Sequence, residues 1–103
     1  MPYEVIMPRL VDCVARIASG ISKKAPSEEC PSLPKIAVEA VELVASRLAP
    51  QSAPALYCVL CYKGPYTRKG YYLHLKRVHG SEIKEEIFRE IKRLEQVYRG
   101  HLE

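Results

Sequence analysis

Residues 56–79 read LYCVLCYKGPYTRKGYYLHLKRVH, and this stretch carries four residues of the kind that bind metal ions. Two residues separate Cys58 from Cys61, twelve lead from there to His74, and four more lead to His79. The spacing C-x2-C-x12-H-x4-H is typical of zinc sites that place two thiolates on one turn and two imidazoles on one helix face. Because four protein ligands close a tetrahedron, the pattern predicts a structural Zn²⁺ ion. The alternative is an accidental match.

The four ligands, together with Leu56 two positions before the first Cys, resemble the C2H2 zinc finger family over residues 56–79. The resemblance implies a β-hairpin packed on a helix that enters the major groove of DNA. The family's aromatic residue after the second Cys would be Pro65 here, with Tyr66 as a candidate shifted by one position. Its usual Leu before the first His is Tyr71.

The same resemblance assigns the base-facing helix positions to Thr67, Gly70 and Leu73, with Lys69 between them. Gly70 has no side chain and Leu73 has no hydrogen-bonding group, whereas base readout needs bidentate donors or acceptors. Three-base readout by the family scheme is therefore not expected. Contacts to the phosphate backbone are favoured instead.

The positive charge of the chain is concentrated in this segment. The chain has 16 Lys and Arg against 12 Asp and Glu, a formal charge of +4, yet residues 55–80 contain five bases and no acid. Such a concentration predicts a surface that meets phosphates; a solvated basic surface is the alternative. The candidate nucleic-acid-binding residues are Lys63, Thr67, Arg68, Lys69, Tyr72, Lys76 and Arg77. Among the tyrosines, we expect Tyr66 and Tyr71 in the core, and Tyr62 and Tyr72 exposed.

Helical periodicity is present on both sides of the segment. Residues 8–49 predict two helices, the first ending near Ser19 before Gly20 and the second starting near Ser32 to Pro34 and ending at Ala49. A third helix is predicted from a Ser81 cap to about Arg99, with Gly100 as its end and Glu85–Arg89 and Glu95–Arg99 as ion pairs. The three apolar seams are Leu10, Val14, Ile17 and Ile21; Ala37, Val41, Val44 and Leu48; and Ile83, Ile87, Ile91, Leu94 and Tyr98.

These elements predict a mostly α fold. We expect a helical hairpin in residues 1–50, a linker at 51–55, a ββα C2H2 finger at 56–80 and an amphipathic helix at 81–103. The second helix is apolar over most of its circumference, which favours a homodimer whose helices form one bundle. A bundle within one chain is the alternative.

Two further observations concern the remaining cysteines and the composition. We expect Cys13 and Cys30 to be buried free thiols, with a disulfide as the alternative and a second metal site disfavoured. The chain has no Asn and only two Gln, a depletion found in proteins from hot environments, so we expect a thermophilic source. No apolar run approaches the ~20 residues of a membrane span, and no signal peptide is apparent, so we expect an intracellular, cytoplasmic protein.

The sequence therefore predicts a small zinc-finger DNA-binding protein, as a dimeric transcriptional regulator or architectural factor that binds double-stranded DNA mainly through phosphates. A protein-interaction module with a structural zinc finger is the first alternative. An RNA or single-strand binder, supported by the tyrosines, is the second. We expect no enzyme and no small-molecule substrate, because no nucleophile–base pair, paired carboxylates or phosphate-binding glycine loop is found.

Overall fold

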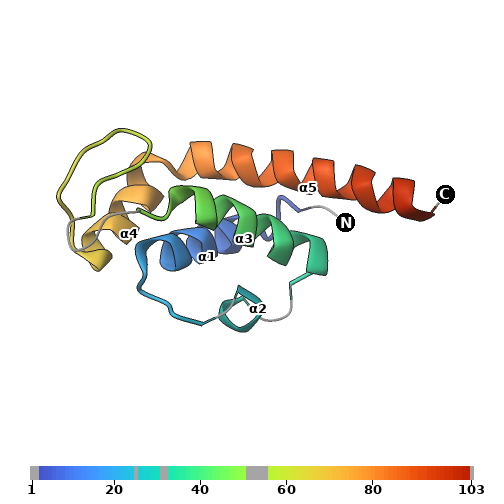
Figure 1. The fold of residues 1–103 in the computed structure, drawn as a ribbon, viewed down its shortest axis with the longest axis horizontal. Helices are drawn as coiled ribbons and strands as arrows, with labels where there is room; N and C mark the ends of the chain where they lie inside the picture. The colour runs from blue at the N-terminus through green and yellow to red at the C-terminus, as the bar shows by residue number, and fades with distance from the viewer. Residues whose placement is uncertain (1–2, 25, 31–32, 51–55, 103) are drawn as a thin grey trace.

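The computed structural model describes residues 3–24, 26–30, 33–50 and 56–102 (Figure 1). Four long helices and one single-turn helix make up the fold: α1 (Met7–Ser19), α2 (Pro26–Glu29), α3 (Lys35–Leu48), α4 (Arg68–Val78) and α5 (Gly80–Leu102). The described residues form no strand. None of their helices combines the length and the apolar character of a membrane span.

The expected ββα finger is wrong, because residues 56–79 contain no β-hairpin. Its only remnant is an isolated antiparallel bridge, in which the Tyr66 N–H donates to the Leu56 carbonyl at 2.7 Å. The backbone groups between them close a turn instead: Cys58 N–H donates to the Lys63 carbonyl, and Tyr62 N–H donates to the Cys58 carbonyl. Because the turn uses these donors and acceptors, no ladder forms and the protein is all-α.

The predicted boundaries of the first two long helices are confirmed. Pro8 lies in the first turn of α1, and Gly20 ends this helix in the left-handed region at φ +82°. A glycine adopts that conformation without a steric penalty. Helix α3 follows Pro34 and ends at Leu48, two residues before Pro50.

Both ends of the third predicted helix are wrong. Helix α5 starts at Gly80 without a Ser81 cap, because the His79 carbonyl already accepts from the Ile83 N–H at 2.9 Å. At the other end, it continues through Gly100 to Leu102. A single glycine costs only about 1 kcal/mol inside a helix and does not end one by itself.

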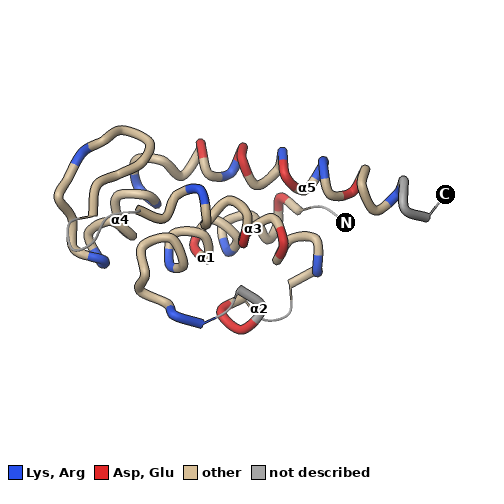
Figure 2. The backbone as a smooth tube through the Cα atoms, viewed as in Figure 1, with Lys and Arg blue, Asp and Glu red and all other residues tan. Residues whose placement is uncertain are grey.

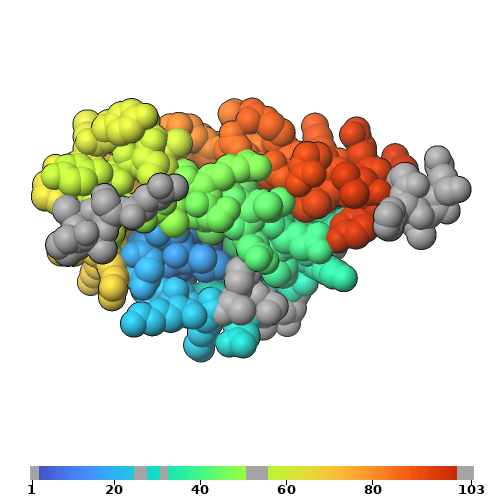
Figure 3. Space-filling model, in the orientation of Figure 1, coloured from blue at the N-terminus to red at the C-terminus, as the bar shows by residue number. Residues whose placement is uncertain are grey.

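Helices α1, α3 and α5 pack as a bundle, and α4 crosses one end of it (Figure 1). In this view α1 and α3 run in the same direction, so the expected hairpin is also wrong. The connecting segment returns along the bundle through α2 before α3 begins. Helix α5 runs opposite to both, and Figure 3 shows α3 lying between α1 and α5.

Helix α3 finds apolar partners within the chain. Its predicted seam is buried, and Ala40 and Ala45 are buried beside it. It packs against α1 on one side and α5 on another, where Ile83, Ile87 and Ile91 are also buried. The apolar circumference that favoured a homodimer is thus largely accounted for by one chain, and the homodimer stays a prediction.

Ion pairs link α3 to α5 at sites that the i,i+4 rule did not indicate. Arg47 of α3 binds Glu90 of α5 at 2.7 Å and Glu86 of α5 at 3.2 Å, and within α5 Arg89 pairs with Glu86 at 2.7 Å. The expected Glu85–Arg89 and Glu95–Arg99 pairs do not form among the described residues. Arg47 holds the pKa of the buried Glu90 carboxyl below its usual value, so this link stabilises the fold above acidic pH.

Cys13 and Cys30 form a disulfide, so the expected free thiols are wrong and the alternative is right. Their Cα atoms are 6.4 Å apart, within the usual range for disulfides. The bond ties α1 to the segment between α2 and α3. Sequence spacing gave no measure of this distance, because it depends on how that segment folds back.

The segment with the four potential ligands shares the core of the bundle. Cys58, Tyr71 and Leu75 are fully buried in the same cluster as the apolar residues of α1, α3 and α5. The Tyr71 hydroxyl donates to the carbonyl of Leu48, the last residue of α3, at 2.6 Å. The predicted 51–55 linker lies outside the described residues.

The substitution Tyr71→Phe tests this connection. It removes the donor and leaves the Leu48 carbonyl buried without its partner, which costs about 1–3 kcal/mol in the free energy of unfolding. Urea unfolding measures this change. The control is Tyr57→Phe at an exposed tyrosine, which we expect to stay within about 0.5 kcal/mol of wild type. Equal stabilities of the two variants would contradict the connection.

Candidate metal centre

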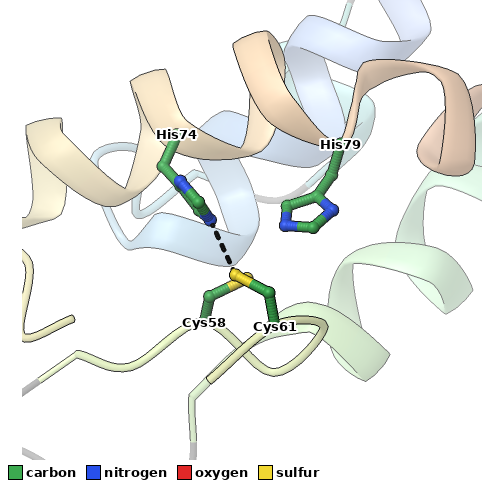
Figure 4. A group of neighbouring side chains, drawn as sticks. All are labelled: Cys58, Cys61, His74 and His79. Atoms are coloured by element: carbon green, nitrogen blue, oxygen red, sulfur yellow. Dashed lines mark hydrogen bonds between the residues drawn. The ribbon is translucent and has the colours of Figure 1, made fainter. Parts of the chain in front are cut away.

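The structure brings Cys58, Cys61, His74 and His79 together, as their spacing predicts. One potential ligand atom from each residue lies within 4.8 Å of the corresponding atoms of the others. The cysteines come from the loop before α4, and the histidines from α4 and its C-terminal end (Figure 4). All four side chains point to one small volume, close enough to hold a metal ion.

A tight turn presents the two thiols. Two backbone hydrogen bonds close it, Cys58 N–H to the Lys63 carbonyl at 2.9 Å and Tyr62 N–H to the Cys58 carbonyl at 2.8 Å. Tyr62 takes a left-handed conformation at φ +63°, which is uncommon for a residue with a side chain. The turn is followed by Gly64, where a Cβ would lie 2.8 Å from the Leu56 carbonyl. A residue larger than glycine at position 64 would therefore push the turn away from the preceding chain.

Helix α4 sets the positions of the two imidazoles. Thr67 caps the helix, its hydroxyl accepting from the Gly70 N–H at 3.0 Å. Its register then places the Nε2 of His74 3.3 Å from the Sγ of Cys61. His79 is the last residue of this helix in hydrogen-bonding terms, since its N–H donates to the Leu75 carbonyl. Its ring turns back toward the cysteines (Figure 4).

The outer nitrogen of each histidine has a hydrogen-bonding partner. The Nδ1 of His74 lies 3.2 Å from the hydroxyl of Tyr66, whose ring also stacks on the imidazole. The Nδ1 of His79 lies 2.8 Å from a carboxylate oxygen of Glu82. Metal-binding histidines usually have such partners, which orient the ring and select the tautomer that leaves Nε2 free to bind.

The Nε2 of His79 is the observation that tests whether a metal fits. This nitrogen is buried and has no hydrogen-bond partner among the described residues. Burying an unpaired polar atom costs roughly 1–3 kcal/mol, and few such atoms occur in folded proteins. A metal ion between the thiols and the imidazoles would give this nitrogen a ligand bond. The site therefore fits a metal ion for two reasons: its four donor atoms suit one, and the ion would bind the unpaired Nε2 of His79.

The local environment favours the metal-binding protonation state at His74 and Cys61, whereas the pKa values of Cys58 and His79 are raised. Burial lowers the pKa of His79, but the Glu82 carboxylate and Cys61 together outweigh this effect. Burial and the neighbouring His79 lower the pKa of His74, which keeps this imidazole neutral. The backbone N–H of Lys63 and the ring of His79 lower the pKa of the Cys61 thiol, whereas burial raises the pKa of Cys58. Because metal ligands must be deprotonated, the remaining protons of these groups leave when the cation binds.

Comparison with protein-family models, curated proteins and solved structures finds no match for this chain. The geometry therefore carries the interpretation of the site. Bonds of about 2.0–2.3 Å to nitrogen and sulfur would hold tetrahedral ligand atoms about 3.3–3.8 Å apart. The observed group, with its atoms within 4.8 Å of one another, needs only small side-chain shifts to reach that arrangement.

Sequence reasoning missed Glu82. The residue stands three positions after His79 and thus one turn further along the chain, where a carboxylate can reach the imidazole. A His followed three positions later by Glu at a helix junction was the available signal. The 2.8 Å contact identifies Glu82 as a positioning residue for His79, and not as a ligand.

The predicted nucleic-acid-binding residues divide into three groups in the structure. Lys63, Arg68, Lys69 and Arg77 are exposed and form no ion pair with any described residue. Tyr72 and Lys76 both bind Asp12 of α1, with Lys76 Nζ 2.9 Å from its carboxylate. The hydroxyl oxygen of Thr67 accepts the hydrogen bond that caps α4. Tyr62 is exposed as expected, whereas Tyr72 is half-buried.

Glu82→Gln tests the positioning role. Loss of the carboxylate weakens the orientation of His79, and we expect metal affinity to fall about 10- to 100-fold, as for other carboxylates that support a metal-bound histidine. Competition with a chelator of known affinity measures the change. The matched control is Glu85→Gln, one turn further along α5 and exposed, which should keep wild-type affinity. Equal affinities for the two variants would show that Glu82 does not position the ligand.

Proposed function

We propose that this protein is a small zinc-stabilised helical protein that binds duplex DNA mainly through its phosphates. One observation carries the proposal. The segment around the candidate metal centre exposes four cations, Lys63, Arg68, Lys69 and Arg77, to solvent. None of them has an ion-pair partner among the described residues, and residues 55–80 contain no acid. Exposed, unopposed cations on a rigid support are what phosphate binding requires.

Zinc is the ion that the donor set favours. Two thiolates and two imidazoles suit Zn²⁺, whereas Mg²⁺ and Ca²⁺ select oxygen ligands. Four protein ligands leave no open coordination position, which supports a structural ion and argues against a catalytic one. The ligand set is that of C2H2 zinc fingers, but the all-α surroundings differ from theirs, so the proposal rests on the site and not on membership of that family.

The residues of α4 favour phosphate contacts over base readout. Gly70 and Leu73 offer no hydrogen-bonding side chain, and the Thr67 oxygen is occupied in the cap. Arg68 and Lys69 form the first turn of α4, where the helix N-terminus adds a partial positive charge. A single module of this size binds weakly, so a homodimer with twice the number of cations would strengthen the contact.

A protein-interaction module is the second candidate. The metal-binding segment exposes several large apolar or aromatic side chains, namely Tyr57, Leu60, Tyr62 and Val78. Such residues are enriched at protein interfaces. The tyrosines among them are also able to stack on unpaired bases, which is the basis for an RNA or single-strand binder.

Removal of the metal tests the structural role of zinc. We expect wild-type protein to bind one Zn²⁺ per chain and to lose helical circular dichroism when a chelator removes it, because zinc binding contributes roughly 10–16 kcal/mol in small zinc domains. Cys58→Ser should abolish stoichiometric binding. The control is the double substitution Cys13→Ser/Cys30→Ser, which removes the other two cysteines and should retain one zinc. An unchanged spectrum in the apo protein would refute this role.

Salt-dependent binding to duplex DNA tests the proposed function. We expect wild-type affinity to fall steeply between 50 and 200 mM salt, by roughly 0.9 log units per log unit of salt for each phosphate contacted. Lys63→Gln/Arg77→Gln should weaken binding and reduce this slope by about 1–2. Lys92→Gln/Arg99→Gln on the distal half of α5 removes the same charge and should leave the slope unchanged. If wild type shows no salt-sensitive binding, the protein-interaction candidate takes its place.

A further inference from the structure

A groove lined mainly by basic side chains lies where the end of α1 meets the start of α4. It has a volume of about 680 Å³. Lys23 and Lys24, from the segment after α1, form one wall, and Arg68 and Lys69, from the first turn of α4, form the other. More than forty residues of sequence separate the two walls. Figure 2 shows both segments, and the loop that carries Lys63, in the half of the molecule away from the C-terminus.

Arg68 lies close to the residue that ends α1. A Cβ on Gly20, the residue that ends α1, would lie 3.6 Å from the Nε of Arg68, so the Arg68 side chain rests on the end of α1. The carbonyl groups at that end carry a partial negative charge, which favours a cation there. Arg68 therefore lies beside the end of α1, at the junction of the two segments that line the groove.

The groove keeps a net positive charge, because its one acid is already paired. Glu29 accepts a hydrogen bond from the Ser22 hydroxyl at 2.6 Å and pairs with Arg16 at 3.2 Å. Arg16 in turn also binds Asp12 at 2.8 Å. Five cations and one paired carboxylate thus line the groove: Lys24 interacts electrostatically with Glu29, and Lys23, Arg68 and Lys69 form no ion pair with a described residue.

We propose that this groove binds the phosphate backbone of duplex DNA, and that Lys23 and Lys24 are DNA-contacting residues. The inference rests on the proposed function and extends it to a segment outside the metal-binding module. Arg68 and Lys69 belong both to the groove and to the basic segment of residues 55–80, so the groove shares two cations with the proposed binding surface. A strand that contacts Arg68 and Lys69 at the N-terminus of α4 would meet Lys23 and Lys24 on the opposite wall.

The lining of the groove favours nucleic acid over an acidic protein. Stable protein interfaces depend on buried apolar and aromatic anchors. Ile21 is the one large apolar residue that lines this groove among the described residues. Long, flexible cationic side chains around an open groove instead match a chain of phosphates, which needs charge more than shape.

The test compares two double variants that each remove two positive charges. Lys23→Gln/Lys24→Gln neutralises one wall of the groove, and Lys92→Gln/Arg99→Gln serves as the control. All four residues are exposed, and none has an ion-pair partner among the described residues, so both variants should keep the wild-type melting temperature and zinc content. Affinity for a 16-base-pair duplex is measured by fluorescence anisotropy between 50 and 200 mM salt.

We expect the groove variant to lose about tenfold or more in affinity at low salt and about 1–2 units of salt slope, with the control close to wild type. If Lys63→Gln/Arg77→Gln weakens binding but the groove variant behaves as the control does, the groove is overturned and the proposed function stands. If wild type shows no salt-sensitive binding to DNA, both are overturned. Tighter binding of a poly-glutamate peptide than of the duplex, lost in the groove variant, would overturn the groove as a DNA site and identify an acidic protein as its partner.

Discussion

The structure depends on the double use of His79. Its imidazole points into the metal centre, while its backbone ends α4 through a bond to Leu75 and begins α5 through a bond to Ile83. A metal ion bound to this ring would hold the junction of two helices against the cysteine turn. Glu82, in the first turn of α5, completes the arrangement by bonding the outer ring nitrogen at 2.8 Å. The His79 ring, the helix junction and the start of α5 thus form one unit.

The metal centre and the helical bundle are also one unit in energetic terms. Cys58 and Tyr71 are fully buried within the core that α1, α3 and α5 share, and the Tyr71 hydroxyl bonds to the end of α3. A structural zinc ion contributes roughly 10–16 kcal/mol to folding, which is of the same size as the 5–15 kcal/mol net stability of a typical domain. For a chain of 103 residues, the proposed ion would therefore decide whether the fold forms at all, and not only the shape of the loop around it.

The charge of the surface is a property of the folded chain more than of the basic segment. Folding removes one predicted cation, because Asp12 of α1 neutralises Lys76. It adds two others, because the segment after α1 brings Lys23 and Lys24 to the start of α4. Residues 1–54 have no net charge as a sequence, yet they supply both the acid that pairs with Lys76 and the two lysines that lie near the start of α4. Net charge by segment therefore predicted neither the pairing of Lys76 nor the approach of Lys23 and Lys24 to α4.

The sequence by itself determined the four potential ligands, the first two long helices and the apolar seam of α5, because each depends on spacing along one local element. Helical periodicity and the Pro and Gly residues that begin or end a helix depend on residues close in sequence. They can therefore be recognised without knowledge of what the helix packs against. The tertiary structure alone decided that no β-hairpin forms and that α1 and α3 run in the same direction. It also decided the Cys13–Cys30 bond and the contacts of Glu82 with His79 and of Asp12 with Lys76. These features depend on which backbone donors are already hydrogen-bonded and on which distant side chains come within about 3 Å of one another when the chain packs. The spacing of residues along one element encodes neither of these two facts.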